Sequence, residues 1–222
     1  MQHVVAIIQA RLSSSRLPRK VLLPLPTGRL VIEEVVFRAR QIKGIDAVVV
    51  ATPDDEDDEI SEAIFRSKML GGFEEPKVFV FQGPHHDVLR RYALAAEAFD
   101  ATHVMRITAD CPLLDPSECE KIISPVLAGV SSYASNVMPR TLPQGLDCEF
   151  FTREILVAAD REATEPYDRE HVTPWMQRQK GRFIVGSWQQ GNDESHIRWT
   201  LDTPEDYVAI CQEFQRRSGV SE

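Results

Sequence analysis

The sequence is short of the features that would place a protein in a membrane or on nucleic acid. No apolar run approaches the ~20 residues that are needed to cross a bilayer. Lysine and arginine number 25 against 34 acids in 222 residues, so the formal charge is -9. A general nucleic-acid binder needs a basic face that displaces counterions. We therefore expect neither a membrane nor a nucleic acid as a partner.

Cysteine is scarce as well, with four residues that form no CxxC pair and no histidine spacing typical of zinc. They are Cys111, Cys119, Cys148 and Cys211. We interpret them as reduced and mostly buried. The first apolar run is too short for a signal-peptide core, and no small-residue cleavage site follows it. These absences predict a cytoplasmic protein.

A basic cluster stands out against the acidic background. Residues 11–20 carry four basic side chains and no acid, and they follow the apolar run Val4–Ile8. The cluster holds Arg11, Ser13, Ser14, Ser15, Arg16, Arg19 and Lys20. Phosphate oxygens require backbone N–H groups, hydroxyls and fixed positive charge, so the turn predicts an anion site. It lacks the glycines of a P-loop or a dinucleotide fingerprint, and a solvated surface loop is the alternative.

Through residue 128, apolar runs of strand length alternate with segments of helical period. We expect strands at Val4–Ile8, Ala47–Ala51, Val78–Phe81 and His103–Thr108, and helices at Leu30–Ile42, 56–69, Asp87–Phe99 and Pro116–Leu127. This pattern is typical of an α/β fold, a mostly parallel sheet covered by helices on both faces. Such sheets bind ligands beyond the carboxyl ends of their strands. The basic turn, Thr52–Asp54 and Ala109–Pro112 all fall on that rim.

The pattern is less regular after residue 128. Strands are expected at Ser131–Val137, Cys148–Phe151, Arg182–Trp188 and His196–Leu201, and helices near 152–160, near 169–179 and at Pro204–Arg216. No repeat, low-complexity tract or flexible linker divides the chain. We therefore predict a single domain over residues 1–222 with an irregular second half.

Several acidic residues have both a functional and a structural interpretation. Asp110 and Asp202 each follow a predicted strand, where two carboxylates suit one shared Mg²⁺ but also suit a turn or a helix cap. The run Asp54–Glu59 has the Asp-x-Asp spacing by which some glycosyltransferases hold a metal. We favour helix capping and solvation for this run, because acids suit the positive end of a helix dipole. Asp147 and the triplet Arg169–His171 suit hydroxyl binding or proton transfer, or an ordinary turn and helix surface.

Short blocks along the chain resemble the cytidylyltransferases related to the spore coat polysaccharide biosynthesis protein SpsF. This group is similar in turn to the CMP-KDO and acylneuraminate synthetases. The blocks are Ile7–Leu22, Val50–Thr52, Asp87–Tyr92, Arg106–Leu113, Leu142–Asp147, Arg169–Pro174 and Arg198–Asp206. They lie in order over nearly the whole chain, and this makes the set specific although each block is short.

The resemblance implies a nucleotide-diphospho-sugar transferase fold of the GT-A kind. It implies that CTP and a sugar or sugar acid give a CMP-sugar and pyrophosphate, with Lys20, Arg11 and Asp110 as catalytic residues. The implied nucleotide contacts are Ala10, Arg11, Ser13, Ser14, Ser15, Arg16, Lys20, Thr52 and Arg106. The implied sugar contacts are Arg140, Gln144, Asp147, Arg169, Glu170 and His171, and the implied Mg²⁺ ligands are Asp110 and Asp202.

The resemblance also divides the chain by role. Residues 1–128 would form the nucleotide-binding part, and residues 129–222 would form the sugar-binding and dimerisation part of a homodimer. The proton of the acceptor hydroxyl would go to Asp147, to His171 or to a metal-bound hydroxide.

Three residues depart from the family pattern. Arg19 and Ala109 stand where glycine is usual, and Gln82 stands where arginine is common. We expect an extra charge or a looser turn at Arg19 and the loss of one phosphate or sugar contact at Gln82. Two alternatives stay open: a glycosyltransferase that consumes a nucleotide sugar through a working Asp-x-Asp, and a nucleotide-binding protein without catalytic activity.

Overall fold

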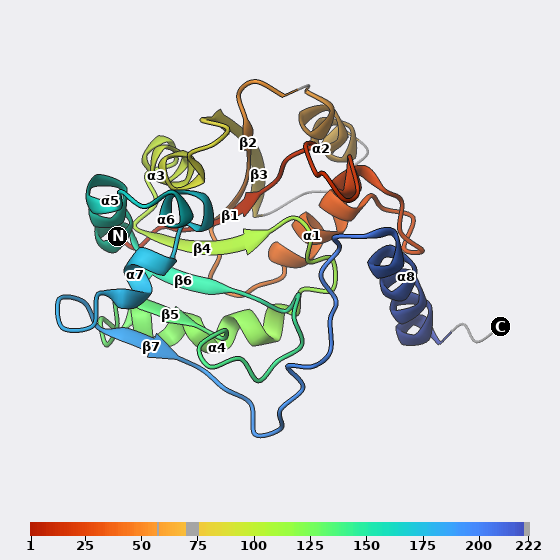
Figure 1. Ribbon diagram of the computed structural model, residues 1–222. Coiled ribbons are helices and arrows are strands. Elements are labelled where there is room, and N and C mark those ends of the chain that lie inside the picture. The colour runs from red at the N-terminus through yellow and green to blue at the C-terminus, as the bar shows by residue number, and fades with distance from the viewer. Residues whose placement is uncertain (57, 70–75, 220–222) are drawn as a thin grey trace.

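The computed structural model describes residues 1–56, 58–69 and 76–219, and its centre is a seven-stranded sheet (Figure 1). The strands are β1 (Val4–Gln9), β2 (Ala47–Pro53), β3 (Lys77–Gly83), β4 (His103–Thr108), β5 (Tyr133–Ser135), β6 (Glu149–Thr152) and β7 (Val185–Ser187), in the order β3-β2-β1-β4-β6-β5-β7. The helices are α1 (Val31–Ala39), α2 (Glu59–Met69), α3 (Val88–Ala98), α4 (Pro116–Leu127), α5 (Arg153–Glu162), α6 (Pro166–His171), α7 (Pro174–Arg178) and α8 (Pro204–Ser218), with a 3₁₀ turn at Lys20–Leu22. Within the described residues, no helix has the length and apolar character of a membrane span.

The first four strands are parallel, and they occupy the positions that the apolar runs predict. β1 pairs with β2 on one side and with β4 on the other, and every residue of β2 is buried. Strand β6 runs antiparallel to β4 and β5, so the sheet is mostly parallel, and the predicted α/β fold class is confirmed. Continuous apolar strands form here because helices cover both faces and neither face meets water.

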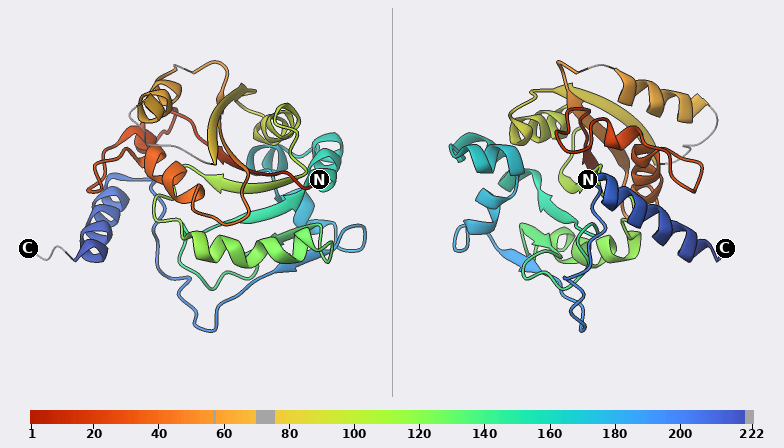
Figure 2. Two further views of the ribbon diagram at one scale, coloured as in Figure 1. Left: turned by 180° about the vertical axis from the view of Figure 1, so that it is seen from behind. Right: turned by 45° about the vertical axis from the view of Figure 1, so that its right-hand side comes forward.

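Two apolar layers fix the helices on the sheet. Helices α1 and α4 cover one face, and α3 and α5 cover the other (Figure 2). The hydroxyl of Tyr92 on α3 lies 3.1 Å from the carbonyl oxygen of Ile7 and 3.2 Å from that of Ile107. This buried contact holds α3 against β1 and β4 near the carboxyl ends of those strands.

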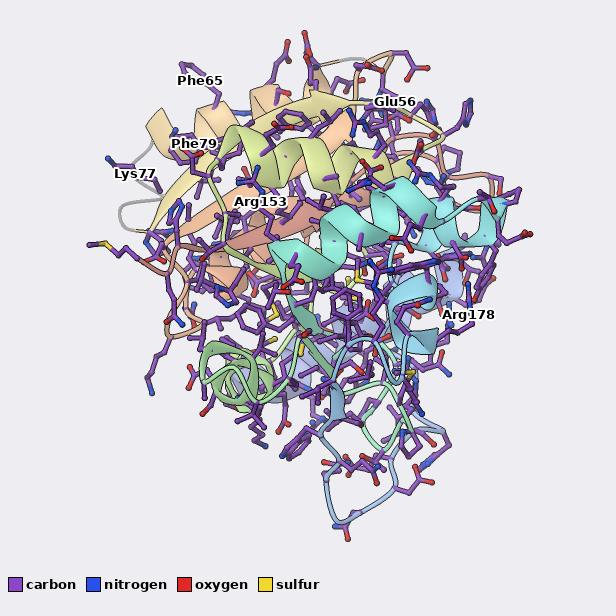
Figure 3. All side chains as sticks on the ribbon, turned by 90° about the vertical axis from the view of Figure 1, so that its left-hand side faces the viewer. Glu56, Phe65, Lys77, Phe79, Arg153 and Arg178 are labelled. Atoms are coloured by element: carbon purple, nitrogen blue, oxygen red, sulfur yellow. The ribbon has the colours of Figure 1, made fainter. Side chains whose placement is uncertain are left out.

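The predicted helix near residues 169–179 is wrong, because the structure has two short helices, α6 and α7, in that region. The chain breaks at Val172, which has a φ of 72°, and α7 begins at Pro174. Proline has no backbone N–H, so Pro174 suits the first turn of a new helix and not the interior of a continuous one. At the end of α7, Arg178 donates a hydrogen bond of 2.5 Å to buried Asp168 of α6 (Figure 3).

The predicted strand His196–Leu201 is also wrong. Its only bridge in the described structure joins Arg198 to Gln144, and Trp199 N donates to the Gln144 carbonyl at 2.7 Å. A side chain at Gly145, whose φ is +103°, would lie 2.6 Å from the Trp199 carbonyl carbon, so the close approach requires glycine. Leu201 N then donates to the Asp110 carbonyl at 2.8 Å, and this bond brings residue 202 beside the end of β4.

The last helix begins where its sequence predicts. The Thr203 hydroxyl accepts a hydrogen bond from Asp206 N, and the Asp206 carboxylate accepts one from Thr203 N. Pro204 occupies the first turn, where a missing N–H costs nothing. Thr203 is therefore the cap, and the carboxylate of Asp202 is free for other contacts.

Candidate active site

A cavity of about 370 Å³ opens at the carboxyl ends of β1 and β4. Its wall comes from the basic turn, both strands, α3, α6 and the segment before α8, which are far apart in the sequence. It brings together twelve of the predicted site residues: Ala10, Arg11, Ser14, Ser15, Arg16, Lys20, Arg106, Asp110, Asp147, Glu170, His171 and Asp202. The rim that the strand pattern indicates therefore carries the candidate site.

Lys20 connects the two aspartates of the site, Asp110 and Asp202. Its ammonium donates hydrogen bonds to Asp110 Oδ2 at 3.0 Å, Asp202 Oδ1 at 2.8 Å and the Leu201 carbonyl at 2.7 Å. The 3₁₀ turn that starts at Lys20 directs the side chain inward, and only 11% of it is exposed. Two carboxylates from distant parts of the chain thus converge on one cation.

Two arginine side chains also lie close to the carboxylate of Asp202. Arg198 Nη2 lies 2.5 Å and Arg16 Nη2 lies 3.2 Å from its Oδ2 atom. Partial burial raises the pKa of Asp202, but Lys20, Arg198 and Arg16 outweigh burial, and the pKa falls below its ordinary value. The carboxylate stays ionised at neutral pH, as a metal or ammonium ligand must be.

The donor set fits a hard divalent cation. Asp110 and Asp202 supply carboxylate oxygens that both lie within hydrogen-bond distance of the Lys20 ammonium, and Thr108 orients Asp110 through a hydrogen bond of 2.6 Å. Within the described residues, no group of three or more His, Cys, Asp or Glu side chains is arranged as metal ligands. A metal held by this pair would complete its shell with water and phosphate oxygens, as Mg²⁺ commonly does.

The acidic run after β2 holds the basic turn in place. Glu56 accepts hydrogen bonds from Leu12 N at 2.6 Å and from Ser13 N at 3.1 Å (Figure 3). His85 connects the same region, 3.3 Å from Ser13 Oγ and 2.7 Å from Asp55 Oδ1. The expectation that the run serves only capping and solvation is therefore wrong for Asp55 and Glu56, whose contacts no local sequence pattern reveals.

None of the described acids in this run lines the cavity, and Asp57 lies outside the described residues. Helix α2 begins at Glu59, later than the expected 56. Gln82, a departure from the family pattern, donates to Asp58 at 2.7 Å and is absent from the cavity wall. The run thus offers the cavity no Asp-x-Asp ligand from its described members.

Arg19 keeps the geometry of the glycine that it replaces. Its φ is 60°, in the left-handed region that favours glycine, and its N–H donates to the Leu12 carbonyl at 3.0 Å. The side chain forms an ion pair with Glu59 of α2. The turn is therefore closed, and the added charge points to α2.

Ala109 also stands where the family pattern has glycine. It lines the cavity, and its N–H donates to the Gln9 carbonyl at 3.0 Å.

Five predicted residues do not line the cavity: Ser13, Thr52, Arg140, Gln144 and Arg169. Arg140 forms an ion pair with Asp147 of the cavity wall, and Gln144 accepts a hydrogen bond of 3.1 Å from Arg198, which in turn pairs with Asp202 of that wall. Thr52 is buried. Arg169 points elsewhere, to Asp87 at 2.5 Å and Asp160 Oδ1 at 2.9 Å.

Arg106 stands on the cavity wall with its charge compensated. Glu149 on β6 accepts from Arg106 Nη1 at 2.5 Å and from the Tyr133 hydroxyl at 2.5 Å. Burial lowers the pKa of Arg106, but Glu149 outweighs burial and the net shift is upward. The pair joins β4 to β6, and no motif in the sequence marks Glu149.

The wall includes residues that the sequence analysis did not single out as site residues: Gln9, Val21, Val88, Arg91, Thr108, Cys111 and Thr200. Cys111 follows Asp110 directly, and burial raises the pKa of its thiol, so it stays protonated and is a poor nucleophile. The chemistry of the cavity therefore comes from cations and carboxylates rather than from a thiolate.

The sheet, the cationic turn and the two converging carboxylates define a nucleotidyltransferase of the nucleotide-diphospho-sugar transferase fold. Residues 5–218 match the family described as Cytidylyltransferase, and the chain belongs to that family.

Individual relatives agree with this assignment. The chain is 32% identical over 223 residues to the spore coat polysaccharide biosynthesis protein SpsF of Bacillus subtilis, covering 97% of this chain and 88% of the relative. A cytidylyltransferase structure from Leptospira borgpetersenii aligns with a TM-score of 0.83 at 28% identity, over 99% and 97% of the two chains. A structure of CMP:2-keto-3-deoxy-manno-octonic acid synthetase complexed with CTP aligns with a TM-score of 0.72 at 18% identity, over 97% and 100%, and shares the fold.

Proposed function

We propose that this protein transfers the cytidylyl group of CTP to a hydroxyl of a sugar or sugar acid, with release of pyrophosphate, for surface polysaccharide synthesis. The observation that carries the proposal is Lys20, held between Asp110 and Asp202 inside a cavity that the basic turn borders. The name of the SpsF relative supports a role in polysaccharide synthesis, and the name of the synthetase in complex with CTP supports a cytidylyl transfer to a sugar acid.

The triphosphate would lie against the basic side of the cavity. Arg11, Arg16 and Lys20 supply positive charge there, and Ser14 and Ser15 supply hydroxyl donors. Attack on the α-phosphorus needs in-line alignment and the spreading of negative charge rather than covalent catalysis. Lys20 is suited to this role because its ammonium can exchange a carboxylate partner for a phosphate oxygen within the cavity.

Asp110 and Asp202 would hold Mg²⁺. Bound there, the ion would neutralise phosphate oxygens and favour departure of pyrophosphate. The two aspartates are suited to this because Thr108 orients one and three cationic side chains keep the other ionised.

The acceptor would lie against the wall formed by Asp147, Glu170 and His171. Asp147 and His171 are the residues there that we assign to accept the proton of the attacking hydroxyl. Arg140 fixes Asp147 from behind through an ion pair. Glu170 is assigned to hydrogen bonding with acceptor hydroxyls.

We place the protein in the cytoplasm as a homodimer formed through its second half. The free cysteines, three of them buried, support a reducing compartment. Among the described residues of the second half, five large apolar side chains are exposed: Val130, Val157, Tyr167, Ile184 and Val208. Sedimentation at several protein concentrations tests the dimer.

The decisive experiment incubates the purified protein with Mg²⁺, CTP and a panel of sugar acids and amino sugars, with UTP and ATP in parallel. Release of pyrophosphate and a CMP-sugar mass are the expected results. A nucleotide sugar consumed with release of a nucleoside diphosphate would indicate the glycosyltransferase instead. CTP that binds but stays intact with every acceptor would indicate a non-catalytic protein.

A further inference from the structure

Arg91 is a buried cation on the cavity wall, and no acidic residue in the described part of the chain forms an ion pair with it. It lies on α3 and is 2% exposed. Its Nη1 atom donates to the Pro84 carbonyl at 3.1 Å, and its Nε atom has no partner within the described structure. Arg106 on the same wall differs, because Glu149 compensates its charge at 2.5 Å.

An uncompensated buried guanidinium is costly. Burial lowers the pKa of Arg91, and the attraction of the more distant Glu56 and Asp54 does not reverse this shift. Buried polar groups in native proteins almost always have partners, and the exceptions commonly mark functional sites. Since Arg91 also lines the cavity, its missing partner is best supplied by a ligand.

On the same wall, Gln9 has an unpaired hydrogen-bond acceptor, whereas Arg91 has unpaired donors. It is the last residue of β1, between Ala51 on β2 and Thr108 on β4. Its Oε1 atom is buried and has no partner, so it is an unused acceptor. The cavity therefore offers unused donors from Arg91 and one unused acceptor from Gln9.

The position of Arg91 assigns it to the nucleotide rather than to the acceptor. Helix α3 packs against β1, β2 and β3 of the nucleotide-binding part and also against α5 and α6, and Arg91 lies on its side toward β3. The stem of Arg91 passes Gly83, where an added Cβ would lie 3.2 Å from Arg91 Cγ. The phosphates have Arg16 and Lys20, which leaves the base as the part that Arg91 would meet.

We propose that Arg91 and Gln9 bind the base of the nucleotide and select cytosine over uracil, an inference that rests on the proposed function. The hydrogen-bonding edge of cytosine carries an amino donor at N4 and acceptors at N3 and O2. The Arg91 guanidinium donates to N3 and O2, and Gln9 Oε1 accepts from N4. Uracil keeps the O2 acceptor but presents an N3–H donor to the guanidinium and an O4 acceptor to Gln9 Oε1, so the contacts at N3 and at position 4 become unfavourable.

The test measures dissociation constants for CTP and UTP by titration calorimetry, without an acceptor. The variants are Arg91→Met, Gln9→Met and, as the matched control, Arg90→Met, since Arg90 is next on the same helix and forms an ion pair with Asp160. Arg91→Met is expected to weaken CTP binding at least about tenfold and UTP binding less than about twofold. Gln9→Met lowers the preference for CTP by a smaller factor, and Arg90→Met leaves it unchanged.

Arg91→Lys keeps the charge without the planar fork, and we expect it to retain only part of the preference for CTP. This variant and Gln9→Met keep the test available if Arg91→Met does not fold, as judged by circular dichroism. Equal losses for CTP and UTP in the Arg91 variants, or a raised KM for the acceptor with unchanged nucleotide binding, would overturn the inference. Wild-type protein that binds neither nucleotide would overturn the proposed function itself, a distinct result.

Discussion

The two halves of the chain differ in regularity and in what they bring to the site. The first half has four parallel strands of six or seven residues, whereas β5, β6 and β7 have three or four. The regular half supplies the cationic turn, and the irregular half supplies Asp147, Glu170 and Asp202. The regular sheet therefore positions the cavity and its cationic turn, while irregular segments of the second half add acidic side chains to its wall.

The halves are joined by ion pairs that cross between them. Lys20 and Arg16 reach Asp202, and Arg106 reaches Glu149. Arg169 on α6 reaches Asp87 at the start of α3. Each pair has one partner in each half, so variants at these positions test whether a contact serves catalysis or only holds the halves together.

The largest effect is expected at Lys20. Lys20→Met removes the cation that both aspartates share, and kcat should fall about 10³-fold because charge on the transferring phosphoryl group loses its nearest stabiliser. Pyrophosphate release measures the effect. Lys43→Met is the control, since Lys43 is 87% exposed and pairs with Glu120 at 3.7 Å. A kcat within tenfold of wild type would contradict the role.

The next largest effect is expected at the two aspartates. Asp110→Asn removes a carboxylate of the first half of the chain, and Asp202→Asn removes one of the second half. We expect each to lower kcat about 10²-fold and to raise the Mg²⁺ concentration for half-maximal activity, because one charged oxygen ligand is lost. Chelation of divalent ions should abolish wild-type activity. Asp193→Asn, at an exposed position, is the control. Unchanged activity of Asp110→Asn would exclude a metal role for that residue.

Arg169→Met separates a structural from a sugar-binding role. Arg169 is 19% exposed and joins α6 to Asp87 and Asp160, so its loss should lower the free energy of unfolding by about 2 kcal/mol. Denaturant unfolding measures this, and KM for CTP should stay unchanged. A raised acceptor KM without loss of stability would instead support the sugar contact that the family resemblance implies.

The lowered pKa of Asp202 predicts that the free energy of unfolding depends on pH. Its pKa is lower in the folded protein than in the unfolded chain, so its ion pairs stabilise the fold above about pH 4 and this contribution is lost as pH falls through the folded pKa. Wild type should therefore exceed Asp202→Asn in unfolding free energy near pH 7, and the two should converge in acid. A constant difference from pH 7 to pH 2 would contradict this origin.

The smallest effect is expected at Arg19. Arg19→Gly removes left-handed strain at φ 60° but also loses an ion pair whose arginine is 56% exposed. Arg19→Ala loses the pair and keeps the strain. The glycine variant should be more stable than the alanine variant by about 1 kcal/mol, measured by denaturant unfolding. Equal stabilities would show that the turn relaxes when Arg19 is replaced.

Prediction from sequence succeeded where local periodicity was strong. The strand His103–Thr108 and the helix Pro116–Leu127 match their predicted bounds, because burial on both faces and a Pro-initiated amphipathic stripe are local signals. It failed at Val172, where one residue with positive φ divides two helices, and at His196–Leu201, which lies against Gly145 instead of a strand. Those conformations depend on partners distant in the sequence.

The amino-acid sequence by itself determined the α/β class, the rim that carries the site and the basic turn, since each follows from local patterns and their order along the chain. Only the tertiary structure decided that Lys20 lies between Asp110 and Asp202, that Glu56 holds the turn and that the buried Nε atom of Arg91 has no partner among the described residues. The physical reason is that charge pairing and burial are set by three-dimensional proximity, which segments far apart in the chain acquire only when the fold is complete.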